Sequence, residues 1–309
     1  MNDPVASSRA EAGHIPASAY WNGAALYAVW GLAPIYFKLL PTVSPYEVVM
    51  HRILWSLFFL GLLCLWTRRI AEVKAATRNR TVIAALLPSA ILISVNWLLN
   101  VIAVAENHIL AISLGYFLTP LVNVGLGIVV LKEKVSRPQI VAIALATIAV
   151  VFMAFSALTT LWISLGLAAC FGTYGLIRKV APVGSTVGLT LETALLAPLS
   201  LLWLGWMWHD GTMAFGRDLP ESLLLVGSGI VLMVPLLFFG VIVRQLPLVA
   251  IGLLQYIGPS VQFLIALFLY REPLGLAKLA SFVLIWIGLA IFSYDTVRTA
   301  RRIRRMRPI

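Results

Sequence analysis

A few ionisable side chains stand inside long apolar runs, where they could bind a polar ligand or carry a proton. Glu47 and His51 are four residues apart and would share one face of a helix, with Arg52 beside them. An imidazole changes its charge between about pH 5 and 8, and a guanidinium can hold an anionic group through two parallel hydrogen bonds. We therefore predict His51 and Arg52 as substrate-binding residues. The alternative is an internal ion pair that joins helices.

Proton coupling has three candidates in the sequence. Glu192 is the one carboxylate deep in a later apolar run. Ionisable groups at membrane depth usually face a cavity or a partner, so such a carboxylate is a candidate proton carrier. Together with Glu192 we consider Glu47 and His51 for this role.

A second set of polar residues repeats one spacing in two distant segments. The spacing of i, i+4 and i+7 is carried by Tyr116, Pro120 and Asn123 and again by Gln255, Pro259 and Gln262. One face of each predicted helix is therefore polar, and the prolines loosen the backbone hydrogen bonds. We predict that these faces line a cavity and that Pro120 and Pro259 act as hinges. The alternative is hydrogen bonding between helices.

Amide and aromatic side chains complete the predicted binding site. Asn96 and Asn100 share a helix face beside Trp97, and Trp30 and Tyr174 stand in other apolar runs. Aromatic rings with amide donors suit a flat or amphipathic solute, although packing is the alternative role for each ring. The predicted substrate-binding residues are Trp30, His51, Arg52, Asn96, Trp97, Asn100, Tyr116, Asn123, Tyr174, Gln255, Tyr256 and Gln262.

Two glutamates stand at the ends of apolar runs. Glu133 and Glu272 each lie next to a basic residue, Lys132 and Arg271. If the two positions lie on opposite sides of a membrane, they could form gate salt bridges that alternate. A plain ion pair at a helix end is the alternative, and such exposed pairs contribute little stability.

The elements that must position these residues follow from the composition. Of the 309 residues, 61% are hydrophobic and only 11% are charged, and the mean hydropathy is +0.96. Soluble proteins of this size carry about 25% charged residues, so the bilayer is the expected solvent. The two cysteines, Cys64 and Cys170, stand in apolar runs and have no metal-ligand spacing.

Ten apolar segments are long enough to cross a bilayer as helices, which takes about 20 residues. They are Ala19–Phe37, Pro45–Trp66, Thr81–Ala105, Ile109–Leu131, Pro138–Ser156, Leu158–Ile177, Ser185–Trp208, Ser222–Val243, Leu246–Tyr270 and Leu274–Tyr294. Because unpaired backbone groups are costly in lipid, each segment should be helical. The predicted fold class is an all-α membrane protein with ten transmembrane helices.

Basic residues gather on one side of these spans. Of the 23 Lys and Arg residues, most precede the first span or follow the second, fourth, sixth, eighth and tenth. Cytoplasmic loops carry such an excess, so we predict that both termini are cytoplasmic. The arginines from Arg298 to Arg307 follow the last span directly, and we expect them to contact anionic lipids rather than nucleic acid.

The two halves of the chain resemble each other at an offset of roughly 140 residues. Matching pairs are Trp21 and Trp162, Gly31 and Gly172, Lys38 and Lys179, Pro120 and Pro259, and Glu133 and Glu272. Each half carries five spans, an odd number, so the second half would be inverted relative to the first. We predict a tail at 1–18, five-helix repeats at 19–156 and 157–297, and a basic tail at 298–309.

Several groups of residues along the chain form a distinctive pattern. They are Trp30–Lys38, His51-Arg52 with Trp55-Ser56, Asn96-Trp97, Ser113–Phe117 with Pro120-Leu121, and Leu254–Ile257 with Pro259-Ser260 and Gln262-Phe263. From about Trp21 to about Asp295 the chain resembles the RarD branch of the EamA drug/metabolite transporters. The resemblance implies ten helices with both termini inside, a central cavity built from the first four helices of each half, and an exporter-like role.

The expected function is secondary transport of small organic solutes across the bacterial inner membrane by alternating access, most plausibly export, with protons as the candidate coupling ion. The sequence has no nucleotide-binding motif and no spacing typical of a catalytic triad. We therefore expect no catalytic residue, no cofactor and no metal, and the lipid bilayer and the solute as partners. An uncoupled facilitator, a membrane-embedded enzyme and a receptor are the alternatives.

Overall fold

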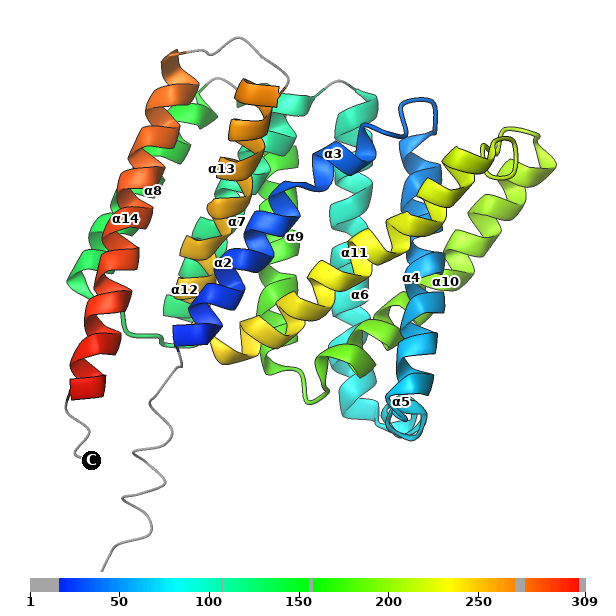
Figure 1. Ribbon diagram of the computed structural model, residues 1–309, viewed down its shortest axis with the longest axis horizontal. Helices are drawn as coiled ribbons and strands as arrows, with labels where there is room; N and C mark the ends of the chain where they lie inside the picture. The colour runs from blue at the N-terminus through cyan, green and yellow to red at the C-terminus, as the bar shows by residue number, and fades with distance from the viewer. Residues whose placement is uncertain (1–16, 107, 156–157, 270–275, 306–309) are drawn as a thin grey trace, which may run out of the picture.

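The protein is a bundle of long helices packed side by side (Figure 1). The computed structural model describes residues 17–106, 108–155, 158–269 and 276–305. Its α-helices are α2 (Ala17–Gly31), α3 (Ala33–Phe37), α4 (Pro45–Trp66), α5 (Ile70–Arg78), α6 (Arg80–Ala105), α7 (Ile109–Val129), α8 (Arg137–Ala154), α9 (Leu161–Val180), α10 (Ser185–His209), α11 (Leu219–Gln245), α12 (Leu248–Gln255), α13 (Ile257–Leu264) and α14 (Leu276–Arg305). A 3₁₀ turn, η1 (Leu158–Thr160), precedes α9, and a π-helical turn, η2 (Ile265–Leu269), follows α13.

Membrane-spanning character is clear from helix length and composition. In the described ranges nine helical segments are long and apolar enough to cross a bilayer. They cover the second to the tenth predicted spans, and no β-strand occurs in the same ranges. The chain is therefore an all-α membrane protein.

The first predicted span, Ala19–Phe37, is helical but has one interruption. It is divided at Leu32 into α2 and α3. Pro34 has no N–H for the carbonyl of Trp30, and its ring crowds that carbonyl. At the break, backbone hydrogen bonds join residues three apart instead of four: Leu32 N donates to Val29 O and Ile35 N donates to Leu32 O, both at 3.0 Å.

The ninth predicted span is also divided. It comprises α12, α13 and η2, and the interruption lies at Tyr256. Pro259 is the physical reason, because it cannot donate to the carbonyl of Gln255. In contrast, α7 continues without interruption through Pro120. Of the two predicted hinge prolines, only Pro259 therefore stands beside a break in its helix.

Local sequence signals fix several helix starts. Ser136 and Gln139 form a capping box at α8, in which the Ser136 hydroxyl accepts from Gln139 N and the Gln139 side chain accepts from Ser136 N at 2.9 Å. The Asn79 side chain accepts from Thr81 N at 3.0 Å at the start of α6. Such caps satisfy backbone donors that have no partner inside the helix.

Two helical features at one end of the bundle were not predicted. The short helix α5 packs through Val73 and Ala76 against α6 and α10. The last helix, α14, continues to Arg305, so the predicted basic tail at 298–309 begins inside it. The first turn of α2, the last turn of α14 and α5 all lie at this end (Figure 1).

The helices pack in a regular set of neighbours. The main contacts join α7 with α9, α8 with α14, α4 with α11, α4 with α10, α7 with α12, and α6 with α9. Helices α2 and α11 also meet, as do α6 and α10, and α2 with α12 and α13. This arrangement brings α2, α4, α6, α7, α9, α11 and α13 around a common centre.

Candidate functional site

A cavity of about 510 Å³ lies at that centre. Residues of α2, α3, α4, α6, α7, α9, α11, α12 and α13 line it, and its wall reaches Leu40 and Val43 in the α3–α4 loop. The residues of α4 that line the cavity lie between Pro45 and Arg52, in the half of this helix that is nearer to the α3–α4 loop. The cavity therefore occupies the half of the bundle that is remote from α5 and from the end of α14. Its size is typical of a site for a small organic ligand.

Most of the predicted substrate-binding residues meet in this cavity. The lining includes Trp30, Arg52, Asn96, Trp97, Asn100, Tyr116, Gln255 and Gln262, together with the predicted hinge Pro259. Four predicted residues, His51, Asn123, Tyr174 and Tyr256, are buried and are not among its wall residues. The cavity thus gathers side chains from positions as distant in the sequence as Trp30 and Gln262.

Arg52 is the charged group of this cavity. Its guanidinium carbon lies 4.7 Å from the ring centroid of Trp97, which is the geometry of a cation–π contact. Its Nε atom is buried and donates no hydrogen bond. None of the ion pairs formed by the described residues includes Arg52.

Amide and phenol groups supply the remaining polarity. The Asn100 side-chain amide donates to the Tyr116 hydroxyl at 3.1 Å, and the Asn96 amide donates to Leu167 O at 2.9 Å. Tyr116 is 44% exposed, although it lies in the interior of α7. Its exposed surface therefore belongs to the cavity rather than to the ends of the bundle.

The repeated polar faces of α7 and α12 meet directly. The Asn123 amide donates to Gln255 Oε1 at 2.5 Å, and the Tyr256 hydroxyl donates to Phe117 O at 3.2 Å. Only Gln255 of these four lines the cavity. Asn123 and Tyr256 thus join helices, which is the role the sequence left as the alternative.

The rings of Trp30, Phe171 and Phe239 pack together at the end of the cavity that is remote from the α3–α4 loop, and we call them the aromatic floor. The Trp30 ring lies 5.7 Å from Phe171 and 6.3 Å from Phe239, and Tyr174 stacks on Phe239 at 6.0 Å. Phe171 and Phe239 lie 5.5 Å apart. These edge-on and stacked contacts favour a tight apolar plug. Tyr174 is fully buried and does not line the cavity.

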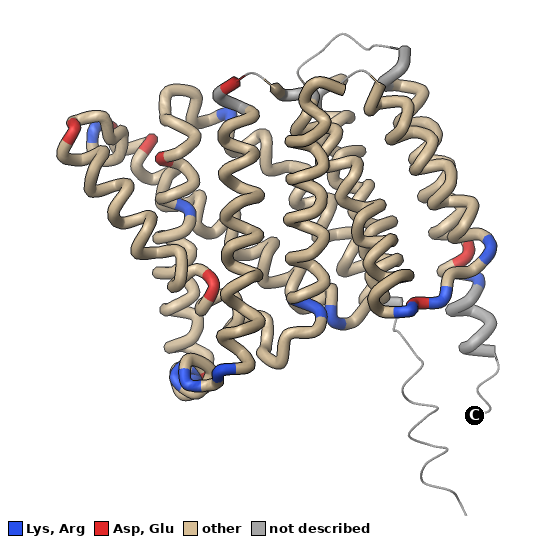
Figure 2. Tube along the Cα trace, turned by 180° about the vertical axis from the view of Figure 1, so that it is seen from behind, with Lys and Arg blue, Asp and Glu red and all other residues tan. Residues whose placement is uncertain are grey.

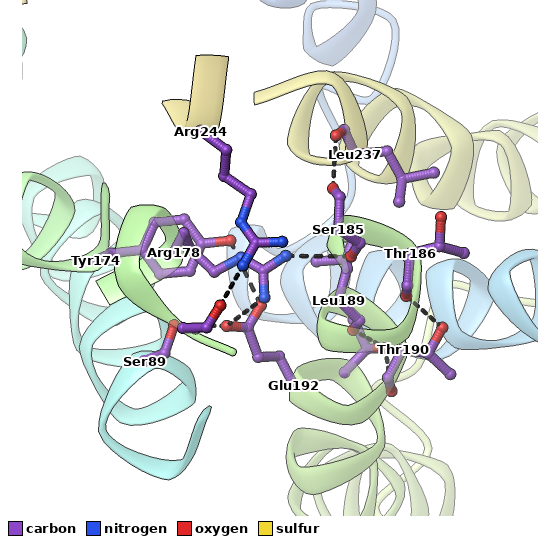
Figure 3. Close-up of polar contacts among 12 residues, drawn as sticks. Ser89, Tyr174, Arg178, Ser185, Thr186, Leu189, Thr190, Glu192, Leu237 and Arg244 are labelled. Carbon is purple, nitrogen blue, oxygen red and sulfur yellow. Dashed lines mark hydrogen bonds and ion pairs between the residues drawn. The ribbon is translucent and has the colours of Figure 1, made fainter. Parts of the chain in front are cut away.

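Beneath the floor lies a buried ionic group, the inner polar cluster, formed by Ser89, Tyr174, Arg178, Ser185 and Glu192 (Figure 3). Arg178 and Glu192 are each only 2% exposed, and Nη1 of the arginine lies 3.6 Å from Oε1 of the glutamate. Ser89 donates to Glu192 at 2.5 Å, and Arg178 donates to Ser185 O at 3.1 Å. The cluster ties α6, α9 and α10 together.

A glycine makes room for this cluster. A Cβ atom at Gly188 would lie 2.1 Å from Arg178 Nη1. Only a residue without a side chain lets the guanidinium lie against the backbone of α10 here.

Glu47 and His51 do not line the cavity. The Glu47 carboxylate accepts from Ala214 N and Phe215 N, each at 2.9 Å, and so attaches α4 to the α10–α11 loop. The His51 ring stacks on Phe215 at 4.7 Å, and its Nε2 lies 3.7 Å from Glu47. Both side chains hold the outer part of the bundle together.

Further contacts tie the helices together at the end of the bundle where α5 lies and α14 ends. The Glu133 carboxylate accepts from Leu248 N at 2.7 Å and Val249 N at 2.9 Å, which caps α12. Lys179 donates to Val243 O at 3.0 Å and links α9 to α11. The second predicted gate residue, Glu272, lies outside the described residues.

The sequence did not indicate three residues that shape the site. Arg178 stands one residue beyond the predicted sixth span, where it resembled an ordinary loop cation. Phe171 and Phe239 stand in apolar runs rich in aromatic residues. The one available indication was Glu192, since a carboxylate so deep in an apolar run requires a partner.

Comparisons with known proteins agree over most of the chain. The EamA-like transporter family matches residues 18–155. An uncharacterized transporter of Pseudomonas aeruginosa is 40% identical over 286 residues, which cover 92% of this chain and 96% of that protein. The protein RarD of Escherichia coli (strain K12) is 40% identical over 279 residues, covering 90% of this chain and 94% of that protein.

A solved structure agrees in fold. It superimposes with a TM-score of 0.68 at 16% identity and covers 89% of this chain and 96% of that chain. Taken with the apolar helices, the relatives indicate a multi-pass inner-membrane protein of the drug/metabolite transporter kind. At 40% identity over nine-tenths of its length, the chain belongs to the RarD branch of the EamA-like transporter family.

Proposed function

We propose that the protein exports small organic solutes across the inner membrane by alternating access, through the cavity that contains Arg52. The observation that carries the proposal is the cavity itself. It is lined by helices of both halves of the sequence, and its lining includes no residue of the inner polar cluster beyond the aromatic floor. A site closed on one side and lined by a few polar groups is what an alternating-access carrier requires.

Helix packing supports a ten-helix inverted repeat at 19–156 and 157–297, with the divided α2–α3 segment as the first span. If α2, α4, α6, α7 and α8 correspond to α9, α10, α11, α12–α13 and α14, the packing of α7 on α9 corresponds to that of α2 on α12 and α13. Likewise α4 on α11 corresponds to α6 on α10, and α6 on α9 to α2 on α11. A two-fold relation between the halves accounts for all three correspondences.

Charge distribution supports an orientation with both termini in the cytoplasm. Lys and Arg gather at the end of the bundle where α5 lies and α14 ends (Figure 1 and Figure 2). The positive-inside rule assigns such an end to the cytoplasm. In this orientation the cavity belongs to an outward-open conformation, and the aromatic floor, the inner polar cluster and Glu133 close the cytoplasmic side.

Alternation then requires these inner contacts to open. In this scheme Glu133 acts as an inner gate residue and Glu272 as its outer counterpart. The break at Tyr256, three residues before Pro259, supplies a flexible point between α12 and α13. Pro120 in α7 is the hinge candidate at the repeat-related position. The scheme predicts an inward-open state in which the contacts of Glu133 with α12 are absent.

Proton coupling is a further part of the proposal, with Glu192 as the preferred carrier. A carboxylate buried against Arg178 at the closed end is positioned to link proton release to opening of that end. Glu47 and His51 are the remaining candidates, at the outer end. An uncoupled facilitator with the same cavity is the alternative, and it would require none of the three.

Solute counterflow in liposomes tests this function. Purified protein would be preloaded with each member of a panel of aromatic, anionic, cationic and neutral solutes, and uptake of the labelled solute would be followed. Counterflow of at least one solute, absent in empty liposomes, is expected. Its absence for the whole panel would contradict transport. Stimulation by a pH gradient that is lost in Glu192→Gln would support coupling, and flux insensitive to pH would favour the facilitator.

A further inference from the structure

We propose that the solute is an organic monoanion, whose negative group binds Arg52 and whose apolar body lies against the aromatic walls of the cavity. This inference rests on the transport function proposed above and gives its solute a chemical class. It depends on the charge balance of the cavity, on the direction of its hydrogen-bond donors and on the nature of its walls.

The charge balance leaves Arg52 without an internal counter-ion. The ion pairs among described residues are those of His51 with Glu47, His108 with Glu106, and Arg178 with Glu192. Glu47 stands five residues before Arg52, but its oxygens already accept from the α10–α11 loop. A cation held in a poorly solvated site is costly unless an anion accompanies it. A bound anion would therefore be stabilised by the same charge that is unfavourable in the empty site.

Donor geometry favours an anionic group over a neutral one. Trp97 covers a face of the Arg52 guanidinium and Nε is buried, so a planar carboxylate or a phosphate would bind at the terminal N–H groups. The Tyr116 hydroxyl accepts from Asn100, which leaves its proton for an acceptor on the solute. Arg52 and Tyr116 thus both offer hydrogen-bond donors to the cavity.

The walls define the rest of the solute. Among the lining residues Arg52 is the only one with a full charge, which matches one negative group and not several. Phe37 and two rings of the aromatic floor, Trp30 and Phe171, give the cavity an aromatic lining, with aliphatic side chains between them. A cavity of about 510 Å³ accommodates a drug-sized body. Sugars and polyanions fit these walls poorly, whereas an amphipathic anion fits them well.

Pairs of compounds that differ only in charge provide the test. The purified protein would be titrated with benzoate and benzamide, indole-3-acetate and indole-3-acetamide, and naphthalene-2-carboxylate and its amide, by tryptophan fluorescence and by thermal midpoint. For at least one pair the anion is expected to bind at least about tenfold more tightly than the amide, which corresponds to about 1.4 kcal/mol. In Arg52→Gln this preference should fall below about threefold, whereas Arg80→Gln, an exposed arginine outside the cavity, should keep it.

Several results would overturn the proposal. They are binding of no anion of the panel, equal binding of the amides, or a preference for anions that survives Arg52→Gln. If Arg52→Gln does not fold, Tyr116→Phe replaces it, and a loss of anion affinity without loss of amide affinity is the expected result. Transport is judged separately by counterflow. Counterflow of neutral solutes alone would refute the anion proposal and keep the transporter, whereas anion binding without any counterflow would do the reverse.

Discussion

The pair of Arg178 and Glu192 should be strongly coupled energetically, and its removal should weaken the closed inner end. At 3.6 Å and an effective dielectric constant of about 20, two unit charges attract by about 4–5 kcal/mol. Loss of one partner leaves the other buried and uncompensated, which costs about 3–5 kcal/mol. We expect each single variant, Arg178→Gln and Glu192→Gln, to cost this amount. The double variant should cost little more than one single variant, so the coupling should exceed about 2 kcal/mol.

A double-mutant cycle measures this coupling. The free energy of unfolding would be determined by titrating the protein in mild detergent micelles with sodium dodecyl sulfate. The partly exposed pair of Glu106 and His108, 3.3 Å apart, is the control, and its coupling should stay below about 0.5 kcal/mol. If the effects of Arg178→Gln and Glu192→Gln are additive within about 0.5 kcal/mol, the two side chains do not form the proposed closure.

Other predictions concern the same inner end and the orientation. Gly188→Ala should displace the Arg178 guanidinium and lower the unfolding free energy by about 1–3 kcal/mol. Gly205→Ala in the same helix, where the added Cβ meets nothing within 4 Å, should not, and equal effects of the two variants would refute the fit. Glu133→Ala should remove two hydrogen bonds to α12 and lower the unfolding free energy by about 1–3 kcal/mol in the same titration. The control is Glu72→Ala, at an exposed position, which should leave the unfolding free energy unchanged. Equal costs of the two variants would contradict this prediction. Green fluorescent protein fused to the C-terminus should fluoresce and alkaline phosphatase there should be inactive, and the opposite pattern would reverse the orientation.

The helical membrane fold could be predicted because apolar length alone requires it. A run such as Pro45–Trp66 has no other stable form in lipid. The breaks at Leu32 and Tyr256 could not be predicted in the same way. Proline also stands inside α6, α7, α10 and α11, which continue through it, because neighbouring groups can satisfy the carbonyl that loses its donor. Only the packing around each proline decides the outcome.

Part of the site could be predicted because a polar side chain at membrane depth usually faces a cavity or a polar partner. Arg52, Asn100 and Tyr116 were predicted on this ground, and they line the same cavity. The partners of the acidic residues required the three-dimensional arrangement. Nothing in the sequence near Glu47 indicates that its carboxylate accepts hydrogen bonds from the backbone amides of Ala214 and Phe215, which are 167 and 168 residues away.

Accessibility of the cavity from both sides of the membrane is the central claim. With Cys64 and Cys170 replaced by alanine, a single cysteine at Asn100 would be treated with a membrane-impermeant maleimide in right-side-out and inside-out vesicles. Cysteines at Arg217 and Glu72, in the loop after α10 and in α5, serve as markers of the outer and inner face. Alternating access predicts that Asn100→Cys reacts from both faces while each marker reacts from one. Labelling of Asn100→Cys from the outer face alone, under conditions in which the inner marker reacts fully, would contradict it.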